Sequence, residues 1–137
     1  MAIYRLLAID YGEVRVGIAL SDPLRIISKP YIVLSNNENL LEEIQKIIRK
    51  ESVGKIILGL PLNLQGEDSK KTIEVREFKQ TLADFIDIPI EFYDERYTTS
   101  EATDVLKKMG YDSKQRRKVI DMMAASIILK SYMDDTK

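Results

Sequence analysis

The hydrophobic positions in the first quarter of the chain form short runs that are typical of buried strands. Residues 3–9 are apolar at all positions but one, as in a strand covered on both faces. Residues 14–20, rich in Val and Ile, form a second run, and residues 26–34 form a third that is interrupted at Pro30. Residues 10–12, Asp-Tyr-Gly, have the composition of a turn between the first two runs. The pattern therefore predicts two or three antiparallel strands at the start of the domain.

Helical and strand patterns alternate in the rest of the chain. Leucine or isoleucine occupies positions 40, 41, 44, 47 and 48, which is the spacing of one helix face. A short apolar stretch that ends in Gly-Leu-Pro follows, as expected for a strand. The predicted elements are a helix at 39–50, a strand at 53–60, a helix at 69–86, a strand at 88–93 and two helices at 98–109 and 113–133.

This order of elements predicts a single α/β domain that spans residues 1–137. Three antiparallel strands, followed by two parallel strands that are added through helical crossovers, give a mixed five-stranded sheet flanked by helices. A chain of 137 residues is long enough to bury such a core without disulfides or a structural metal.

The chain contains neither cysteine nor histidine. These absences exclude disulfides, thiolate nucleophiles, Ser-His catalysis and zinc sites built from Cys or His. Any bound metal would be a hard cation that prefers oxygen ligands, such as Mg²⁺ or Mn²⁺. The formal net charge is −1, with 21 basic and 22 acidic residues, so nucleic acid would have to bind at a local basic patch.

The start of the chain is too briefly apolar for a signal peptide or an anchor. No stretch approaches the length needed to cross a membrane. We therefore expect a cytoplasmic protein with no membrane partner.

Three acidic residues from distant parts of the chain lie where the predicted fold would bring them together. Asp10 follows the first predicted strand, Glu95 follows the last one, and Asp121 lies on the last predicted helix. The carboxyl ends of parallel strands meet at one edge of a sheet, where α/β proteins bind ligands. The three carboxylates predict a site for one or two Mg²⁺ or Mn²⁺ ions, which would activate water for phosphodiester hydrolysis without histidine.

Each of these acids also has a purely structural interpretation. Asp10 alone is typical of a turn, and Glu95 alone is typical of a solvated strand end. Asp121 lies within an apolar helix face beside two small alanines, where an unpaired carboxylate is costly to bury. Its partner could be a metal shared with the other two acids, or a salt bridge to Arg117, Lys118 or another basic residue. Only the coincidence of three acids predicts the metal site.

Polar and basic segments lie close to these acids in the sequence. Residues 59–63, Gly-Leu-Pro-Leu-Asn, lead from a strand into a polar loop in which Asn63 either contacts phosphate or forms a connecting turn. Arg96 could pair with an acid, and Thr98 could cap the next helix. The densest basic stretch, residues 107–118, is typical of a solvated face, with nucleic-acid contact as the alternative.

Taken in order, these motifs resemble the YqgF family. The resemblance implies a ribonuclease-H-like fold and a nuclease, since the family is described as Holliday-junction resolvases and as nucleases that mature the 5′ end of pre-16S ribosomal RNA. The match spans nearly the whole chain, and four motifs in the same order make it specific. The matching segments are Leu7-Ala8-Ile9-Asp10-Tyr11-Gly12 with Arg15, Gly17, Ala19 and Ser21-Asp22; Gly59-Leu60-Pro61; Asp94-Glu95-Arg96-Tyr97-Thr98-Thr99; and Asp121-Met122-Met123-Ala124-Ala125.

The resemblance assigns roles to individual residues. It implies that Asp10, Glu95 and Asp121 are the catalytic, metal-binding acids. One departure is the acidic Gln-Gly-Glu-Asp sequence at 65–68, which argues against phosphate contact by its last two residues. The residues with implied supporting or substrate-contacting roles are Arg15, Asn63, Arg96 and Thr98.

The resemblance favours a metal-dependent endonuclease that matures the 5′ end of pre-16S rRNA, with RNA preferred to DNA and pre-ribosomal particles as partners. The first alternative is a Holliday-junction resolvase, for which paired cuts need a two-fold dimer. The sequence shows no dimerisation heptad, and both a monomer and a homodimer stay open. The second alternative is a non-catalytic RNA-binding ribosome-assembly factor, against which a carboxylate pocket that repels phosphate argues. An actin-like or sugar-kinase-like ATP binder would need two such domains, and the chain is too short for them.

Overall fold

Five strands form one mixed sheet in the computed structural model, which describes the backbone of residues 3–97 and 113–136 and the side chains of 3–96 and 120–136. The strand order is β3-β2-β1-β4-β5. β2 pairs antiparallel with β1 and β3, whereas β4 runs parallel to β1 and β5. The predicted mixed sheet is therefore confirmed. The strands are β1 Arg5–Tyr11, β2 Arg15–Ser21, β3 Ser28–Ser35, β4 Val53–Leu60 and β5 Ile90–Asp94.

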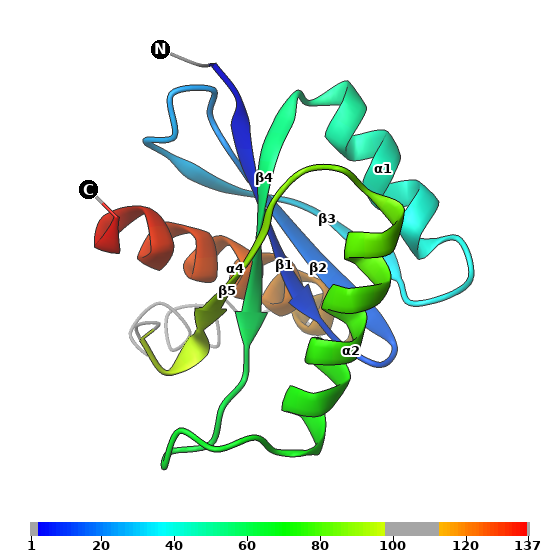
Figure 1. Cartoon of the computed structure of the whole chain (residues 1–137), viewed down its shortest axis with the longest axis vertical. Helices are drawn as coiled ribbons and strands as arrows, with labels where there is room; N and C mark the ends of the chain where they lie inside the picture. The colour runs from blue at the N-terminus through cyan, green and yellow to red at the C-terminus, as the bar shows by residue number, and fades with distance from the viewer. Residues whose placement is uncertain (1–2, 98–112, 137) are drawn as a thin grey trace.

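Helices cover both faces of this sheet, as Figure 1 shows. α1 and α2 pack on one face and form the larger core with it. α4 crosses the other face and encloses a second, smaller core. The helices are α1 Leu40–Lys50, α2 Lys70–Phe85 and α4 Ser113–Asp135, and a short 3₁₀ helix, η1, covers Glu95–Tyr97.

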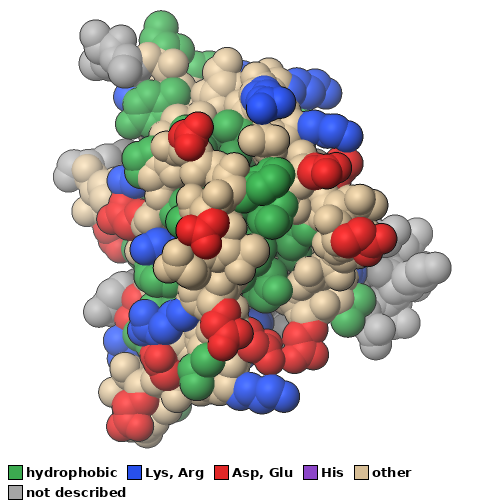
Figure 2. Space-filling model, turned by 45° about the vertical axis from the view of Figure 1, so that its right-hand side comes forward, with side chains coloured by type: hydrophobic (Ala, Val, Ile, Leu, Met, Phe, Trp, Pro, Cys, Tyr) green, Lys and Arg blue, Asp and Glu red, His purple; other side chains and the backbone are tan. Residues whose placement is uncertain are grey.

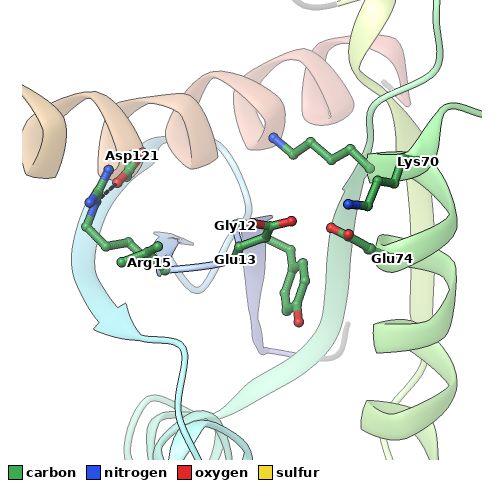
Figure 3. Close-up of a pocket in the computed structure, with 9 residues that line it drawn as sticks. Gly12, Glu13, Arg15, Lys70, Glu74 and Asp121 are labelled. Atoms are coloured by element: carbon green, nitrogen blue, oxygen red, sulfur yellow. Dashed lines mark hydrogen bonds and ion pairs between the residues drawn. The ribbon is translucent and has the colours of Figure 1, made fainter.

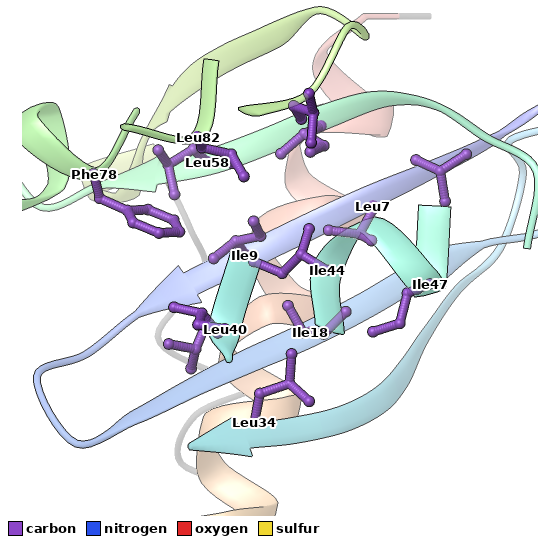
Figure 4. Packing of buried hydrophobic residues seen from close by; sticks show 14 of the residues in the cluster. Leu7, Ile9, Ile18, Leu34, Leu40, Ile44, Ile47, Leu58, Phe78 and Leu82 are labelled. Carbon is purple, nitrogen blue, oxygen red and sulfur yellow. The ribbon is translucent and has the colours of Figure 1, made fainter. Parts of the chain in front are cut away.

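Alternate residues of β1 point into the two cores. Leu7 and Ile9 pack against α1 and α2 (Figure 4), whereas Leu6 and Ala8 belong to the core under α4. All four side chains are buried. A strand that is covered on both faces needs apolar residues at successive positions, which is why its sequence reads as an uninterrupted apolar run.

The backbone of α4 lies very close to β2. A Cβ atom added to Gly17 of β2 would be 2.0 Å from the carbonyl oxygen of Asp121 on α4. Ala8, Ala19 and Ala125 are fully buried in the same core, and these small side chains allow the close approach. This close packing fixes the position of Asp121 relative to the sheet.

Two details differ from the sequence prediction. β1 continues through Asp10 to Tyr11, which pairs with Val16, so Asp10 lies within the strand and not in a turn. Pro30 is tolerated inside β3 because β3 is an edge strand whose register shifts at this point.

The helix predicted at 98–109 lies outside the described residues. None of the helices in the described ranges combines the length and the apolar character needed to cross a membrane.

Candidate active site

Asp10 and Glu95 approach each other across the end of β4. Asp10 lies near the carboxyl end of β1, Glu95 opens η1 directly after β5, and β4 runs between these two strands. Gly59 of β4 leaves room for the approach, since a Cβ there would be 2.5 Å from Glu95 Oε1. The two acids therefore meet at the carboxyl edge of the parallel strands, where the sequence analysis expected them.

Burial raises the pKa of both carboxyl groups. The pKa of Asp10 rises from 3.8 to about 6, and that of Glu95 rises from 4.5 to about 7. Carboxylate repulsion raises both values further, because Asp121 acts on Asp10 and Asp10 acts on Glu95, while the cation of Lys71 lowers both. Near neutral pH these two acids form a site that an added positive charge would stabilise.

Asp121 is held by Arg15. The Nε atom of Arg15 donates to Asp121 Oδ2 at 2.7 Å across 106 positions of sequence. Of the two partners that the sequence left open for Asp121, the salt bridge to a basic residue is therefore present. Asp121 also acts electrostatically on Asp10, so it borders the same centre. Within the described ranges, no three acidic side chains already stand together as a formed metal site.

A cleft of about 450 Å³ opens beside these acids. Figure 3 shows Arg15 and Asp121 on one side of it, Lys70 and Glu74 of α2 on the other, and the Gly12–Glu13 turn between them. Asp10 and Glu95 lie beyond the cleft lining. Lys71 connects the two regions, since it lines the cleft and also acts on both buried acids.

In the described part of the chain, the positive charge near the cleft comes from a few individual residues. Among the described residues, the face shown in Figure 2 carries acidic and basic side chains interspersed around exposed hydrophobic ones, with no broad basic surface. The cations that line the cleft are Arg15, Lys70 and Lys71.

The loop between β4 and α2 is shaped by its own polar side chains. Asn63 Oδ1 accepts hydrogen bonds from the backbone N–H groups of Gln65 at 3.0 Å and Glu67 at 2.8 Å. Thr72 Oγ1 donates to the carbonyl oxygen of Pro61 at 2.6 Å, which ties the loop to the first turn of α2. The turn-forming role of Asn63 is therefore present, and its side-chain nitrogen is the atom that a phosphate contact would use.

Arg96 pairs with an acid, as one interpretation of the sequence expected. Its guanidinium donates to both carboxylate oxygens of Asp94 at 2.6–3.1 Å, and this contact lowers the pKa of Asp94. Arg96 also lies against the loop, since a Cβ at Gly66 would be 3.1 Å from Arg96 Nη1. Arg96 thus joins the end of β5 to the loop after β4. Thr98 and the side chains of the basic stretch 107–118 lie outside the described part of the chain.

Lys71 was not among the residues that the sequence analysis selected. Its sequence signal is positional, because Lys70 and Lys71 directly follow Ser69, the N-cap of a helix that starts where the loop after β4 ends. That helix start lies at the same edge of the sheet as the acids. A lysine in the first turn there could have been selected on this basis.

Solved structures show that the fold is that of ribonuclease-H-like resolvases. T. thermophilus RuvC in complex with a Holliday junction substrate superposes with a TM-score of 0.60 at 10% sequence identity, covering 98% of this chain and 97% of that chain. The fowlpox virus Holliday junction resolvase superposes with a TM-score of 0.55 at 14% identity, covering 97% of this chain and 99% of that chain. The class of protein is therefore a ribonuclease-H-like α/β domain, as predicted.

The chain belongs to the RuvX family, described as Holliday junction resolvase, which it matches over residues 4–135. A Maridesulfovibrio salexigens protein is 41% identical over 131 residues, 94% of this chain and 97% of its own length. A Dictyoglomus turgidum protein is 37% identical over 139 residues, 97% of this chain and 99% of its own length. Both relatives bear the name "Putative pre-16S rRNA nuclease". The predicted family, also called YqgF, and the predicted enzyme class of nuclease are thus confirmed.

Proposed function

We propose that this protein is a metal-dependent endonuclease that hydrolyses phosphodiester bonds in RNA and matures the 5′ end of pre-16S ribosomal RNA. The observation that carries the proposal is the meeting of Asp10 and Glu95, with raised pKa values, beside Asp121 at the carboxyl edge of the sheet. The names of the relatives support the choice of RNA. The working location is the cytoplasm, and pre-ribosomal particles are the partners.

The donor set at this edge fits Mg²⁺ or Mn²⁺. Asp10, Glu95 and Asp121 supply only carboxylate oxygens, the ligands that hard divalent cations prefer. Two of them carry pKa values raised by burial and by a neighbouring carboxylate, which an added positive charge would reverse. These three acids would hold one or two ions, and the ions would lower the pKa of a bound water and offset phosphate charge.

A few polar and basic residues near the centre position the acids and the substrate. Arg15 holds Asp121 through its Nε atom, and among the described side chains no other contact uses its terminal nitrogens, which would meet a phosphate in the cleft. Asn63 presents its side-chain nitrogen from a loop that its own oxygen stabilises. Arg96 fixes the end of β5, from which Glu95 follows directly. Together with Thr98, these residues form the proposed substrate contacts.

The test is cleavage of a 5′-extended small-subunit rRNA precursor by purified protein in Mg²⁺ or Mn²⁺, with EDTA as the metal-free control. Asp10→Asn and Asp121→Asn keep the shape of the side chains and remove their charge. Asp84→Asn, an exposed acid near the far end of α2, is the matched control. We expect metal-dependent cleavage that both site variants lose and the control keeps. Equal cleavage by Asp10→Asn and wild type would refute the proposed centre.

A four-way DNA junction is the second candidate substrate, favoured by the family description and by the fold shared with RuvC. Paired cuts on a junction require a two-fold dimer that presents two sites. Junction cleavage by a protein that sediments as a dimer, with no cleavage of the RNA precursor, would replace the RNA proposal. If neither substrate is cut and the precursor is still bound, the protein acts as an RNA-binding assembly factor.

A further inference from the structure

Lys71 has a fixed place in the first turn of α2. Ser69 caps this helix in a reciprocal arrangement with Thr72, in which each side chain accepts a hydrogen bond from the backbone N–H of the other. Thr72 is fully buried and its hydroxyl is bound to the loop after β4. Lys71 lies between these two anchored residues, so its backbone is held while its side chain is exposed.

The ammonium group of Lys71 has no direct bonding partner among the described side chains. Among the residues whose side chains are described, none forms a hydrogen bond or a salt bridge with it, whereas Arg15 is bound to Asp121 and Lys55 to Glu91. Its charge nevertheless acts on both buried acids, Asp10 and Glu95. Lys71 is therefore near the centre without being neutralised by a direct contact.

The neighbouring Lys70 differs in this respect. Both lysines are exposed and both line the cleft, but only Lys71 is among the charges that act on Asp10 and Glu95. Figure 3 shows Lys70 beside Glu74, on the wall of the cleft that faces the Gly12–Glu13 turn. Of these two adjacent lysines, Lys71 is therefore the one whose charge acts on the acidic centre.

The other charges of the cleft restrict where a phosphate group can bind. Glu13 and Glu74 line it and repel phosphate, and the charge of Arg15 is partly offset by Asp121. A nucleic-acid strand that approaches Asp10 and Glu95 needs positive charge close to them, because three carboxylates otherwise oppose its entry. Lys71 is the described cation in that position.

We propose that Lys71 binds the phosphate group that lies next to the Asp10–Glu95 centre and so positions the substrate strand for cleavage. This role rests on the proposed nuclease function. It differs from a purely structural role, in which Lys71 would only balance the charge of the buried acids in the free protein. A structural counterion would change stability and leave substrate affinity untouched.

The experiment compares Lys71→Met with Lys70→Met, which removes the same charge one residue away while keeping a similar apolar stem. Binding of the 5′-extended RNA is measured in the Asp10→Asn background over a range of salt concentrations. We expect Lys71→Met to weaken binding about tenfold at low salt and to lower the slope of log affinity against log salt by about one. Lys70→Met should weaken binding by less than about threefold, because Lys70 lines the cleft but is not among the charges that act on Asp10 and Glu95. Lys71→Arg should restore most of the loss.

Cleavage in Mg²⁺ by the same lysine variants in the wild-type background completes the test. A lower kcat/KM for Lys71→Met, carried mainly by a higher KM, supports phosphate binding in the ground state. Equal affinity and equal salt slopes for Lys71→Met and Lys70→Met would overturn the role of Lys71, while wild-type cleavage in the same assay would leave the nuclease proposal standing. If the wild type binds the RNA without cutting it, the nuclease proposal fails and the binding comparison still decides the role of Lys71. Thermal unfolding of each variant identifies any loss that comes from misfolding.

Discussion

The ionised carboxylate of Asp10 lowers the stability of the folded, metal-free protein. Burial raises its pKa from 3.8 to about 6, with a smaller contribution from the nearby Asp121 carboxylate. A carboxyl group whose pKa is higher in the folded state favours folding when protonated and opposes it when ionised. The cost is therefore absent below about pH 4, grows as the pH rises toward 6, and is complete above that value. Asp10→Asn should remove it.

The size of the effect follows from the two pKa values of Asp10. A difference of about two pH units corresponds to about 3 kcal/mol of unfolding free energy above pH 7. The same substitution also relieves Glu95, because the Asp10 carboxylate is the second largest cause that raises the pKa of Glu95. We therefore expect Asp10→Asn to be more stable than wild type by roughly 2–3 kcal/mol at pH 8 in EDTA, although it should be inactive.

Urea unfolding of wild type, Asp10→Asn and Asp84→Asn in EDTA between pH 4.5 and pH 8 measures this effect. The difference between wild type and Asp10→Asn should grow with pH, while Asp84→Asn should follow wild type throughout. Addition of Mg²⁺ should stabilise wild type and leave Asp10→Asn nearly unchanged, because the cation offsets the charge that the variant lacks. A stability difference of the same size at pH 4.5 and pH 8 would show that burial of the ionised carboxylate is not its cause.

Three further substitutions probe how the fold positions the acids. Gly17→Ala places a methyl group where the carbonyl oxygen of Asp121 lies 2.0 Å away, so we expect a loss of about 3 kcal/mol or more in urea unfolding; a loss below about 1 kcal/mol would contradict the close packing of α4. Gly59→Ala would meet side-chain atoms that can move, including Glu95 Oε1 at 2.5 Å. It should cost only about 1–2 kcal/mol but displace Glu95 and reduce kcat severely, and an unchanged kcat would argue against a role for Glu95 at this position. Arg15→Met removes a partly buried ion pair worth about 1 kcal/mol, so its stability should change little while its kcat/KM falls; normal cleavage would restrict Arg15 to a structural role.

The sheet and the helices could be predicted from the sequence because their patterns are local. The apolar run at residues 3–9 reflects a strand that carries one core on each face, and this needs no knowledge of distant residues. The turn predicted at Asp10 was wrong for the opposite reason. Its backbone belongs to β1 because it pairs with Gly17 on β2, a contact that the local composition does not encode.

The candidate site depends on contacts that bridge the chain. Asp10 and Glu95 could be selected because acidic residues stand out at the ends of apolar strands, and Asp121 because it interrupts an apolar helix face. Their surroundings could not be selected in the same way, since the salt bridge of Arg15 with Asp121 spans 106 positions. Of the two glycines that admit the acids, Gly17 was matched by family resemblance alone and Gly59 was interpreted only as part of a strand exit, because the absence of a side chain has meaning only when the atoms opposite are known.

The positions of the acids depend on the small residues around them. Gly59 and Gly17 bring Glu95 and the backbone of Asp121 close to the carboxyl end of β1, which stabilises the packing of the sheet but forces carboxylates together. Among the side chains that the structure describes, Arg15 offsets this repulsion through its salt bridge to Asp121, and the charge of Lys71 acts on the other two acids. Under the proposed function, divalent cations would bring further positive charge to this centre and leave Lys71 for the phosphate of the substrate. Because the buried Asp10 carboxylate opposes folding when ionised and is proposed to hold the metal, stability and activity should respond in opposite directions when Asp10 is neutralised.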